Sequence, residues 1–460
     1  MEKTYQRIIF ALKTLKKLAC SLVLLSVFLN FNNAHALSLI SDEETEVFLH
    51  QTLRPIFKAA DVTFYPEHIY IVNDNSLNAF VSEGNRMFVH IGTLISAESQ
   101  NEISGVLAHE TGHIQGGHIL RHKIQAQEVQ NVSLASMLVG GLAGVATGHA
   151  DLSMAAILGS QSSAINSMLK YQISEERSAD NAAIKILQKI NQSPAGMLKF
   201  MQRIKDRNRL EGITEHEYYR THPMTDERIG FLEEAVKNSH AQQQGLQEQA
   251  FQRIKAKLFA YTNTPQNTFI RYPFKDKSIP ARYARTIAYY KQADMGKAQK
   301  EIDDLIKDEP NNPYFYELKG QMFIENGHLK EAIKAYQKAL ELNPSSSLFK
   351  LNLAQATLED TPSRQELKQI VIWLNQILIH NTENPLVWLL LSRAYGELED
   401  HANSYYAAAE FSLSHGDINT AQRQADMVLN ARPSATLKLK TDDLVQRIKQ
   451  IEQDKLKKNH

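Results

Sequence analysis

The chain has 460 residues, a mass of 52.1 kDa, and 51 basic and 51 acidic residues. Hydrophobic residues make up 43% and charged residues 22%, which excludes a wholly disordered chain and a polytopic membrane protein. This length favours two domains. Five basic residues and one acidic residue lie in the first 36, so the rest of the chain has 46 basic and 50 acidic residues. That balance argues against a nucleic-acid-binding protein, which is normally basic.

The first 36 residues have the pattern of a secretory signal peptide. A basic segment ends at Lys17, an apolar run extends from Leu18 to Phe31, and small residues stand at Ala34 and Ala36. We expect cleavage after Ala36 and a periplasmic location. The alternative is an uncleaved anchor, but a run of 14 residues is short of the roughly 20 that span a bilayer. The single cysteine lies in this segment, so the remainder has no disulfide framework, thiolate metal site or cysteine nucleophile.

Residues 37–262 mix strand and helix patterns. Short β-branched and aromatic runs predict strands at Ile69–Val72 and Met87–Ile91. Helical patterns cover 41–59, 102–122, 176–189 and 194–207. The predicted fold class is α+β: a mostly helical domain with a small sheet, then a linker at 263–278, then an all-α domain at 279–460.

Residues 279–460 repeat with a period near 34 residues and resemble tetratricopeptide repeats. In the window 313–346, six residues fall at the consensus positions of that repeat: Tyr316, Gly320, Phe323, Ala332, Tyr336 and Ala339. Successive helix pairs end at the prolines Pro310, Pro344 and Pro385. The last two prolines are 41 residues apart, which places an excess of seven residues near Thr361-Pro362. We expect a solenoid with a C-terminal capping helix and a concave face that holds a partner or substrate. An unspecified helical bundle is the alternative.

The motif His109-Glu110-Thr111-Gly112-His113 lies in an apolar-periodic stretch without proline, which predicts a helix. Histidines four residues apart share one helix face and can bind one metal ion. Neutral imidazole suits zinc. Glu110 is offset around the helix, where it can accept a proton from the attacking water. The alternative is a surface helix with two solvated histidines.

A catalytic zinc site takes three protein ligands, and two candidates exist for the third. His118 is one residue short of the metzincin spacing, so we interpret it as structural or as support for a ligand. The other candidate is Glu176. Asp180 lies one turn further on, where it can accept the second N–H of a ligand histidine. The neighbouring Glu175 is a rival that the spacing alone leaves open.

Four strings resemble, in this order, the gluzincin metallopeptidases that include the heat-shock protease HtpX and the CAAX prenyl proteases. They are Asn78-Ala79-Phe80, Val106 to His113, Glu176 to Asp180, and Thr221-His222-Pro223 with Arg228-Ile229. The resemblance covers about residues 45–235. It implies a zincin-type peptidase domain with one zinc ion per chain, and its E-x-x-A-D pattern implies Glu176 as the third ligand.

Three further segments carry open alternatives. The resemblance places His222 and Arg228 near the site, where the histidine either stabilises the oxyanion or occupies the open metal position; a proline-led turn with a structural salt bridge is equally compatible. The run Met87–Ile91 is either an edge strand that pairs with substrate or a buried strand. Residues 129–169 predict a mobile apolar hairpin that covers the site or touches a membrane, in preference to a true transmembrane span.

Two functions compete. The first is a periplasmic zinc endopeptidase that degrades misfolded or stalled envelope proteins held by the repeats. The second is mainly a chaperone or assembly factor with a latent protease. In both cases unfolded or misassembled envelope proteins are the expected substrates, and the outer-membrane assembly machinery is a candidate partner.

Overall fold

The structure is a computed structural model that describes residues 38–121, 123–124, 172–211, 222–241, 247–380, 382 and 384–458. The predicted signal peptide and the predicted apolar hairpin at 129–169 lie outside these residues. Within the described residues, no helix combines the length and the apolar character that crossing a membrane requires.

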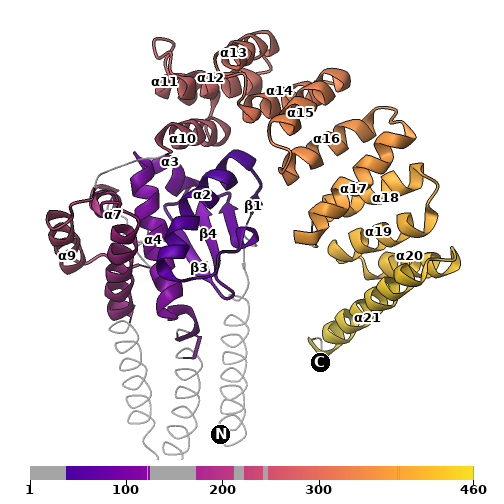
Figure 1. The fold of residues 1–460 in the computed structure, drawn as a ribbon, viewed down its shortest axis with the longest axis horizontal. Coiled ribbons are helices and arrows are strands. Elements are labelled where there is room, and N and C mark those ends of the chain that lie inside the picture. The colour runs from indigo at the N-terminus through magenta and orange to yellow at the C-terminus, as the bar shows by residue number, and fades with distance from the viewer. Residues whose placement is uncertain are drawn as a thin grey trace, which may run out of the picture. The chain divides into compact units, whose positions relative to one another are not determined.

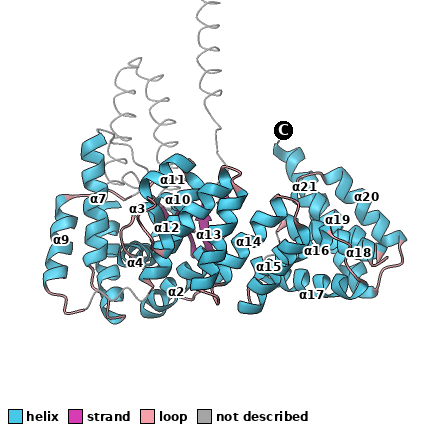
Figure 2. Cartoon of the chain, turned by 90° about the horizontal axis from the view of Figure 1, so that it is seen from above, coloured by secondary structure: helices cyan, strands magenta, loops and turns pink. Residues whose placement is uncertain are grey.

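The described chain is mostly helical, with one small sheet near its N-terminal end (Figures 1 and 2). In chain order the elements are β1 (Leu39–Ile40), α2 (Glu43–Ala60), the 3₁₀ helix η1 (Pro66–His68), β2 (Ile69–Val72), β3 (Ala79–Ser82), β4 (Arg86–His90), α3 (Ile91–Ser96), α4 (Gln100–Gly116), α7 (Ala195–Glu211), α9 (Asp226–Lys237), α10 (Glu248–Thr262), α11 (Pro265–Arg271), α12 (Ile279–Lys291), α13 (Met295–Asp308), α14 (Pro313–Glu325), α15 (Leu329–Leu342), α16 (Ser347–Glu359), α17 (Arg364–His380), α18 (Pro385–Glu397), α19 (His401–Ser414), α20 (Ile418–Asn430) and α21 (Ala435–Lys458). Residues 172–189 are also helical. The predicted α+β fold class is confirmed.

The sheet has four strands in the order β1-β2-β4-β3. Only β2 and β4 run parallel; the other two pairs are antiparallel. The two predicted strands are present, but β4 is paired on both sides, so the edge-strand alternative for residues 87–91 is wrong. The edge strands are β1 and β3, and the turn from β3 into β4 uses Gly84 and Asn85, with φ of +78° and +58°. Strands β1 and β3, with two and four residues, were not predicted from the sequence.

One face of the sheet packs on α2 and α4. Side chains alternate along β4, so Met87 and Val89 are fully buried and join a core that includes Phe57 and Leu107. On the other face, Tyr70, Phe88 and Phe80 stack across three neighbouring strands with ring centroids 4.9 and 4.8 Å apart. The buried face fixes the direction of α4, and α4 carries the metal-binding motif.

Helix α10 contributes to two hydrophobic cores. Phe251, Ile254 and Leu258 belong to the core of the sheet region, whereas Ala256 and Ala260 belong to the core of the first helix pair at α12 and α13. Helix α11 follows directly and lies within the range predicted as linker. The two parts of the chain are therefore joined through a shared helix.

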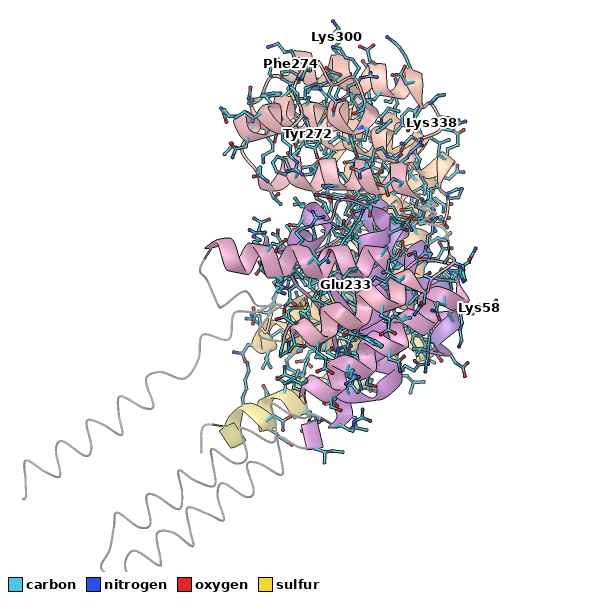
Figure 3. The ribbon with its side chains drawn as sticks, turned by 90° about the vertical axis from the view of Figure 1, so that its left-hand side faces the viewer. Lys58, Glu233, Tyr272, Phe274, Lys300 and Lys338 are labelled. Carbon is cyan, nitrogen blue, oxygen red and sulfur yellow. The ribbon has the colours of Figure 1, made fainter. Side chains whose placement is uncertain are left out.

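The repeats start at intervals of 34, 34, 38 and 33 residues, measured from α12 to α14, α16, α18 and α20. Gly320 allows the close pairing typical of these repeats, because a Cβ there would lie 2.6 Å from the ring of Tyr336. Pro385 is the first residue of its helix, whereas Pro344 stands three residues before its helix, so the true excess is four residues. Three of these lengthen α17 to 17 residues, against 14 in α15. On the second helices of the early pairs, Lys300 and Lys338 project outward (Figure 3).

Candidate metal centre

Helix α4 places the first two predicted ligands side by side. His109 and His113 are 0% and 7% exposed, and their Nε2 atoms lie 3.2 Å apart. The helix ends at Gly117, whose φ of +63° lets its N–H bond to the carbonyls of His113 and Ile114. Both imidazoles therefore face one buried point, as their four-residue spacing predicts.

The helical residues 172–189 bring Glu176 to the same point. Its Oε2 lies 3.3 Å from His109 Nε2, and its Oε1 lies 3.3 Å from His113 Nε2. Gly112 permits this approach, because a Cβ there would lie 2.7 Å from the carbonyl oxygen of Ala179. A larger residue in the middle of the motif would push the two helices apart.

His222 completes a cluster of four groups that can bind a metal. One ligand atom from each of His109, His113, Glu176 and His222 lies within 4.8 Å of all the others. His222 Nδ1 is 3.0 Å from Glu176 Oε1 and 3.4 Å from His109 Nε2. Imidazole nitrogens and a carboxylate that converge in a buried space form the donor set preferred by zinc and similar divalent metals. The residues therefore fit the predicted metal.

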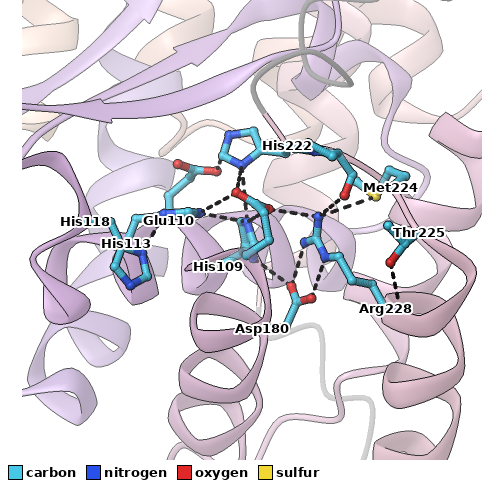
Figure 4. Close-up of polar contacts among 11 residues, drawn as sticks. His109, Glu110, His113, His118, Asp180, His222, Met224, Thr225 and Arg228 are labelled. Carbon is cyan, nitrogen blue, oxygen red and sulfur yellow. Dashed lines mark hydrogen bonds and ion pairs between the residues drawn. The ribbon is translucent and has the colours of Figure 1, made fainter. Parts of the chain in front are cut away.

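Asp180 and Arg228 hold the ligands from behind (Figure 4). Asp180 Oδ1 lies 2.9 Å from His109 Nδ1, the ring nitrogen that faces away from the cluster. Arg228 donates to Asp180 through Nε at 2.6 Å and Nη2 at 2.8 Å, and its Nη1 lies 2.8 Å from Glu176 Oε2. Nη1 also donates to the carbonyl of Pro223 at 2.9 Å. The guanidinium thus positions both carboxylates and the loop that carries His222.

His118 lies behind His113 rather than among the ligand atoms. The Nδ1 atoms of the two rings are 2.9 Å apart, so one nitrogen donates and the other accepts. With Nε2 of His113 directed at a metal, its Nδ1 would carry the proton and His118 would accept it. Gly116 leaves room for this ring, because a Cβ there would lie 2.3 Å from His118 Nε2. Of the two interpretations given for His118, this contact favours support of a ligand.

Glu110 is 0% exposed and lies beside the cluster. Among the described residues, neither of its carboxylate oxygens has a hydrogen-bond partner, and Oε1 is 3.5 Å from His222 Nε2. Burial raises the pKa of Glu110, and the nearby His222 and His109 oppose that rise. A carboxylate with a raised pKa and free lone pairs is suited to accept and return a proton.

The ionisation of the cluster follows from burial and contacts. Burial disfavours the charged form of His109, but Asp180 and Glu176 outweigh it and raise its pKa to about 10. Burial lowers the pKa of His113 to about 3 against the opposing contact with Glu176. Burial disfavours the charged form of Glu176, yet His222, His109 and His113 hold its pKa well below the usual range. The site therefore keeps an ionised carboxylate.

The structure separates the two adjacent glutamates. Glu175 Oε1 lies 3.3 Å from Arg121 Nε, whereas Glu176 is the one that belongs to the cluster of converging groups. The sequence suggested support of a ligand for His118 and a structural salt bridge for Arg228, but it did not identify their partners, which are His113 for the first and the carboxylates of Asp180 and Glu176 for the second. Neither has a local sequence signal, since both join residues through the fold.

Comparisons with known proteins agree with this geometry. Residues 43–236 match peptidase family M48, and residues 320–359 match the TPR repeat. The chain is 24% identical over 395 residues to the beta-barrel assembly-enhancing protease of Escherichia coli K12, covering 83% of this chain and 78% of that protein. It is 26% identical to metalloprotease LoiP of the same organism, over 36% of this chain and 61% of LoiP.

Among solved structures, a pilF protein of Pseudomonas aeruginosa aligns at 15% identity and a TM-score of 0.29, over 42% of this chain and 98% of that one. The predicted enzyme class, a metallopeptidase, and the predicted repeats are confirmed by the two family matches.

Proposed function

Because residues 43–236 are a peptidase family M48 domain followed by TPR repeats, we propose that the chain is a zinc-dependent endopeptidase of the periplasm. Its substrates are misfolded or stalled envelope proteins. The names of its relatives support a task in outer-membrane β-barrel assembly. The basic and apolar start of the sequence supports export, with residues 1–36 as a cleaved signal peptide.

In this proposal His109, His113 and Glu176 hold one zinc ion. When bound, zinc supplies Lewis acidity that polarises a peptide carbonyl and makes water a nucleophile at neutral pH. The protein residues do the remaining work. Asp180 fixes the ring of His109 by facing its Nδ1, His118 does the same for His113, and Arg228 holds Glu176 in place through its Nη1.

Glu110 is the proposed general base and acid. Its oxygens lie in a buried space without hydrogen-bond partners among the described residues, so they are available to take a proton from the attacking water. The same carboxyl then returns the proton to the leaving amine. Burial raises its pKa, which favours the protonated form that returns the proton.

His222 has two proposed roles, and its position favours one of them. Its Nδ1 lies 3.0 Å from Glu176 Oε1, among the ligand atoms, which supports occupation of the open metal position and restraint of the enzyme. Movement of its loop would instead make the ring a donor to the oxyanion. His222→Ala raises proteolysis under the first role and lowers it under the second.

The observation that carries the proposal is the convergence of His109, His113 and Glu176 beside a buried Glu110. The test compares two adjacent glutamates. Glu176→Gln should lose bound zinc, measured by mass spectrometry of the metal, whereas Glu175→Gln should retain one equivalent.

The general base is tested separately. Glu110→Gln should retain zinc but lose cleavage of an unfolded protein by about 10²-fold or more, because an amide does not accept the proton. Near-normal cleavage by this variant would remove Glu110 from the mechanism.

We further propose that the repeats recruit the substrate, with the peptidase domain at 37–262 and the repeats at 279–460 after a linker. A chain ending at Thr262 keeps Phe251, Ile254 and Leu258 in the first core, so it should still bind zinc and slowly cleave an unfolded protein. It should fail to complement a deletion strain under envelope stress. Full complementation by this shortened chain would contradict recruitment by the repeats.

The assembly function of the relatives favours a second candidate, a chaperone or assembly factor with a latent protease. Under that candidate, full-length Glu110→Gln restores much of the function in cells, since binding suffices. Under the endopeptidase proposal the same variant traps substrates without restoring growth. Contacts with the outer-membrane assembly machinery and with a membrane surface belong to the proposal and are tested by crosslinking in cells.

A further inference from the structure

A cavity of about 770 Å³ lies between the first repeats and the start of the peptidase domain. Its walls come from α10, α12, α14, α15 and α16, from the residues just before α2, from the loop after β2, and from the first residue of α3. None of the residues at the metal centre lines it. The volume lies within the range of ordinary ligand sites.

The charges around this cavity are mainly negative. Asp42, Glu317 and Glu325 line it, and Lys257 is its one basic lining residue. Lys257 Nζ lies 2.7 Å from Asp42 Oδ2 and 3.0 Å from Glu44 Oε2, so two carboxylates already match its charge. The cavity therefore favours a positively charged ligand.

Glu317 on α14 is the acidic group left without a partner. It makes no hydrogen bond or ion pair among the described residues. Burial raises the pKa of Glu317 to about 8. The positive charge of Lys257 opposes this rise, and the negative charges of Asp42 and Glu44 add to it. A cation placed beside this carboxylate would relieve the cost of its burial.

Two buried tyrosines add acceptors and ring faces to the same cavity. Tyr283 and Tyr336 are 1% and 4% exposed, line the cavity, and have hydroxyls without a hydrogen-bond partner among the described residues. Each hydroxyl oxygen is therefore available to accept a hydrogen bond from a ligand in the cavity. A carboxylate, hydroxyl acceptors and aromatic rings together form a site for an ammonium or guanidinium group.

We infer that this cavity binds a lysine or arginine side chain of an extended polypeptide. The carboxylate of Glu317 pairs with the cationic end, and Tyr283 and Tyr336 accept its remaining N–H groups. The polypeptide is the committed occupant because the cavity lies among the helices of the repeats, which hold peptides by their concave face. Binding here does not require the peptidase chemistry, so it is tested separately from the proposed function.

The test uses the full-length chain with Glu110→Gln, so that the probe is not cleaved. The probe is a fluorescent 12-residue Gly/Ser peptide with one central arginine, and fluorescence anisotropy reports its binding. A second probe carries citrulline, which keeps the shape of arginine without its charge. The arginine peptide should bind at least tenfold more tightly than the citrulline peptide.

Glu317→Gln should remove this preference, and Tyr283→Phe should weaken binding of the arginine peptide severalfold without changing the cavity shape. The matched control is Glu331→Gln, which removes the same charge from an exposed position on α15 outside the cavity. It should change affinity less than twofold. Equal binding of both peptides, or equal effects of Glu317→Gln and Glu331→Gln, would overturn the inference.

Discussion

Replacing Arg228 by methionine should strongly destabilise the protein when no metal is bound. The guanidinium is 3% exposed and makes three contacts of 2.6–2.8 Å with the carboxylates of Asp180 and Glu176, which are themselves 0% and 1% exposed. Methionine fills the space but removes the positive charge that both buried carboxylates contact. Removing one partner of a buried ion pair typically costs about 3–5 kcal/mol. For a domain of this size, that corresponds to a fall in Tm of about 6–20 °C.

The assay is unfolding by denaturant in the presence of a chelator, followed by far-UV circular dichroism. The control is Arg177→Met, because Arg177 pairs with Glu227 at 2.6 Å but both side chains are about two-thirds exposed. Its loss should cost less than about 1 kcal/mol. Adding zinc should restore part of the stability of the Arg228 variant, since a cation then faces Glu176 again. If the two arginine variants lose equal stability, the carboxylates do not depend on Arg228 and the reasoning is wrong.

Three further outcomes are expected. Gly112→Ala should lower zinc affinity at least tenfold in a chelator competition, because its Cβ would lie 2.7 Å from the carbonyl of Ala179; unchanged affinity would contradict the close approach of the two helices. Chelation should lower the Tm of the wild-type chain, because a metal that binds only the folded state stabilises it; an identical Tm would argue against a bound metal. Burial raises the pKa of Glu46 to about 7, so its stabilising contribution is present below pH 4.5 and is lost as the pH rises through 7. Glu46→Gln should therefore raise the free energy of unfolding at pH 8 more than at pH 5, and equal changes at both would refute the assignment.

The sequence predicts the site residues that lie on one helix. It leaves open the contacts between residues that are far apart in the chain. The spacing of His109 and His113 determines their common direction once the segment is helical, so both could be placed in advance. Spacing could not decide between Glu175 and Glu176. The two are adjacent, and which of them points toward α4 depends on how their helix is rotated about its axis. The resemblance to gluzincins favoured Glu176, and the structure places that residue at the cluster.

The rest of the site depends on long-range contacts. Arg228 reaches carboxylates 48 and 52 residues earlier in the chain, and no local pattern encodes such a pair. In the sheet, β1 has only two residues, and β3 (Ala79–Ser82) lacks the unbroken β-branched and aromatic run that marked β2 (Ile69–Val72), so neither was predicted. The repeats could be predicted because each helix pair has its own small and aromatic positions. The spacing was overestimated at one repeat, because Pro385 begins α18 instead of preceding it.

Helix α10 has a consequence for how the molecule unfolds. Its residues Phe251 and Leu258 lie in the core of the peptidase region, while Ala256 and Ala260 lie in the core of the first helix pair. Melting the first helix pair would expose one side of α10 and weaken its hold on the other core. The two regions should therefore lose structure in a coupled transition, unlike domains on a flexible tether. By the same linkage, a polypeptide bound in the repeats would slow the opening of the peptidase region.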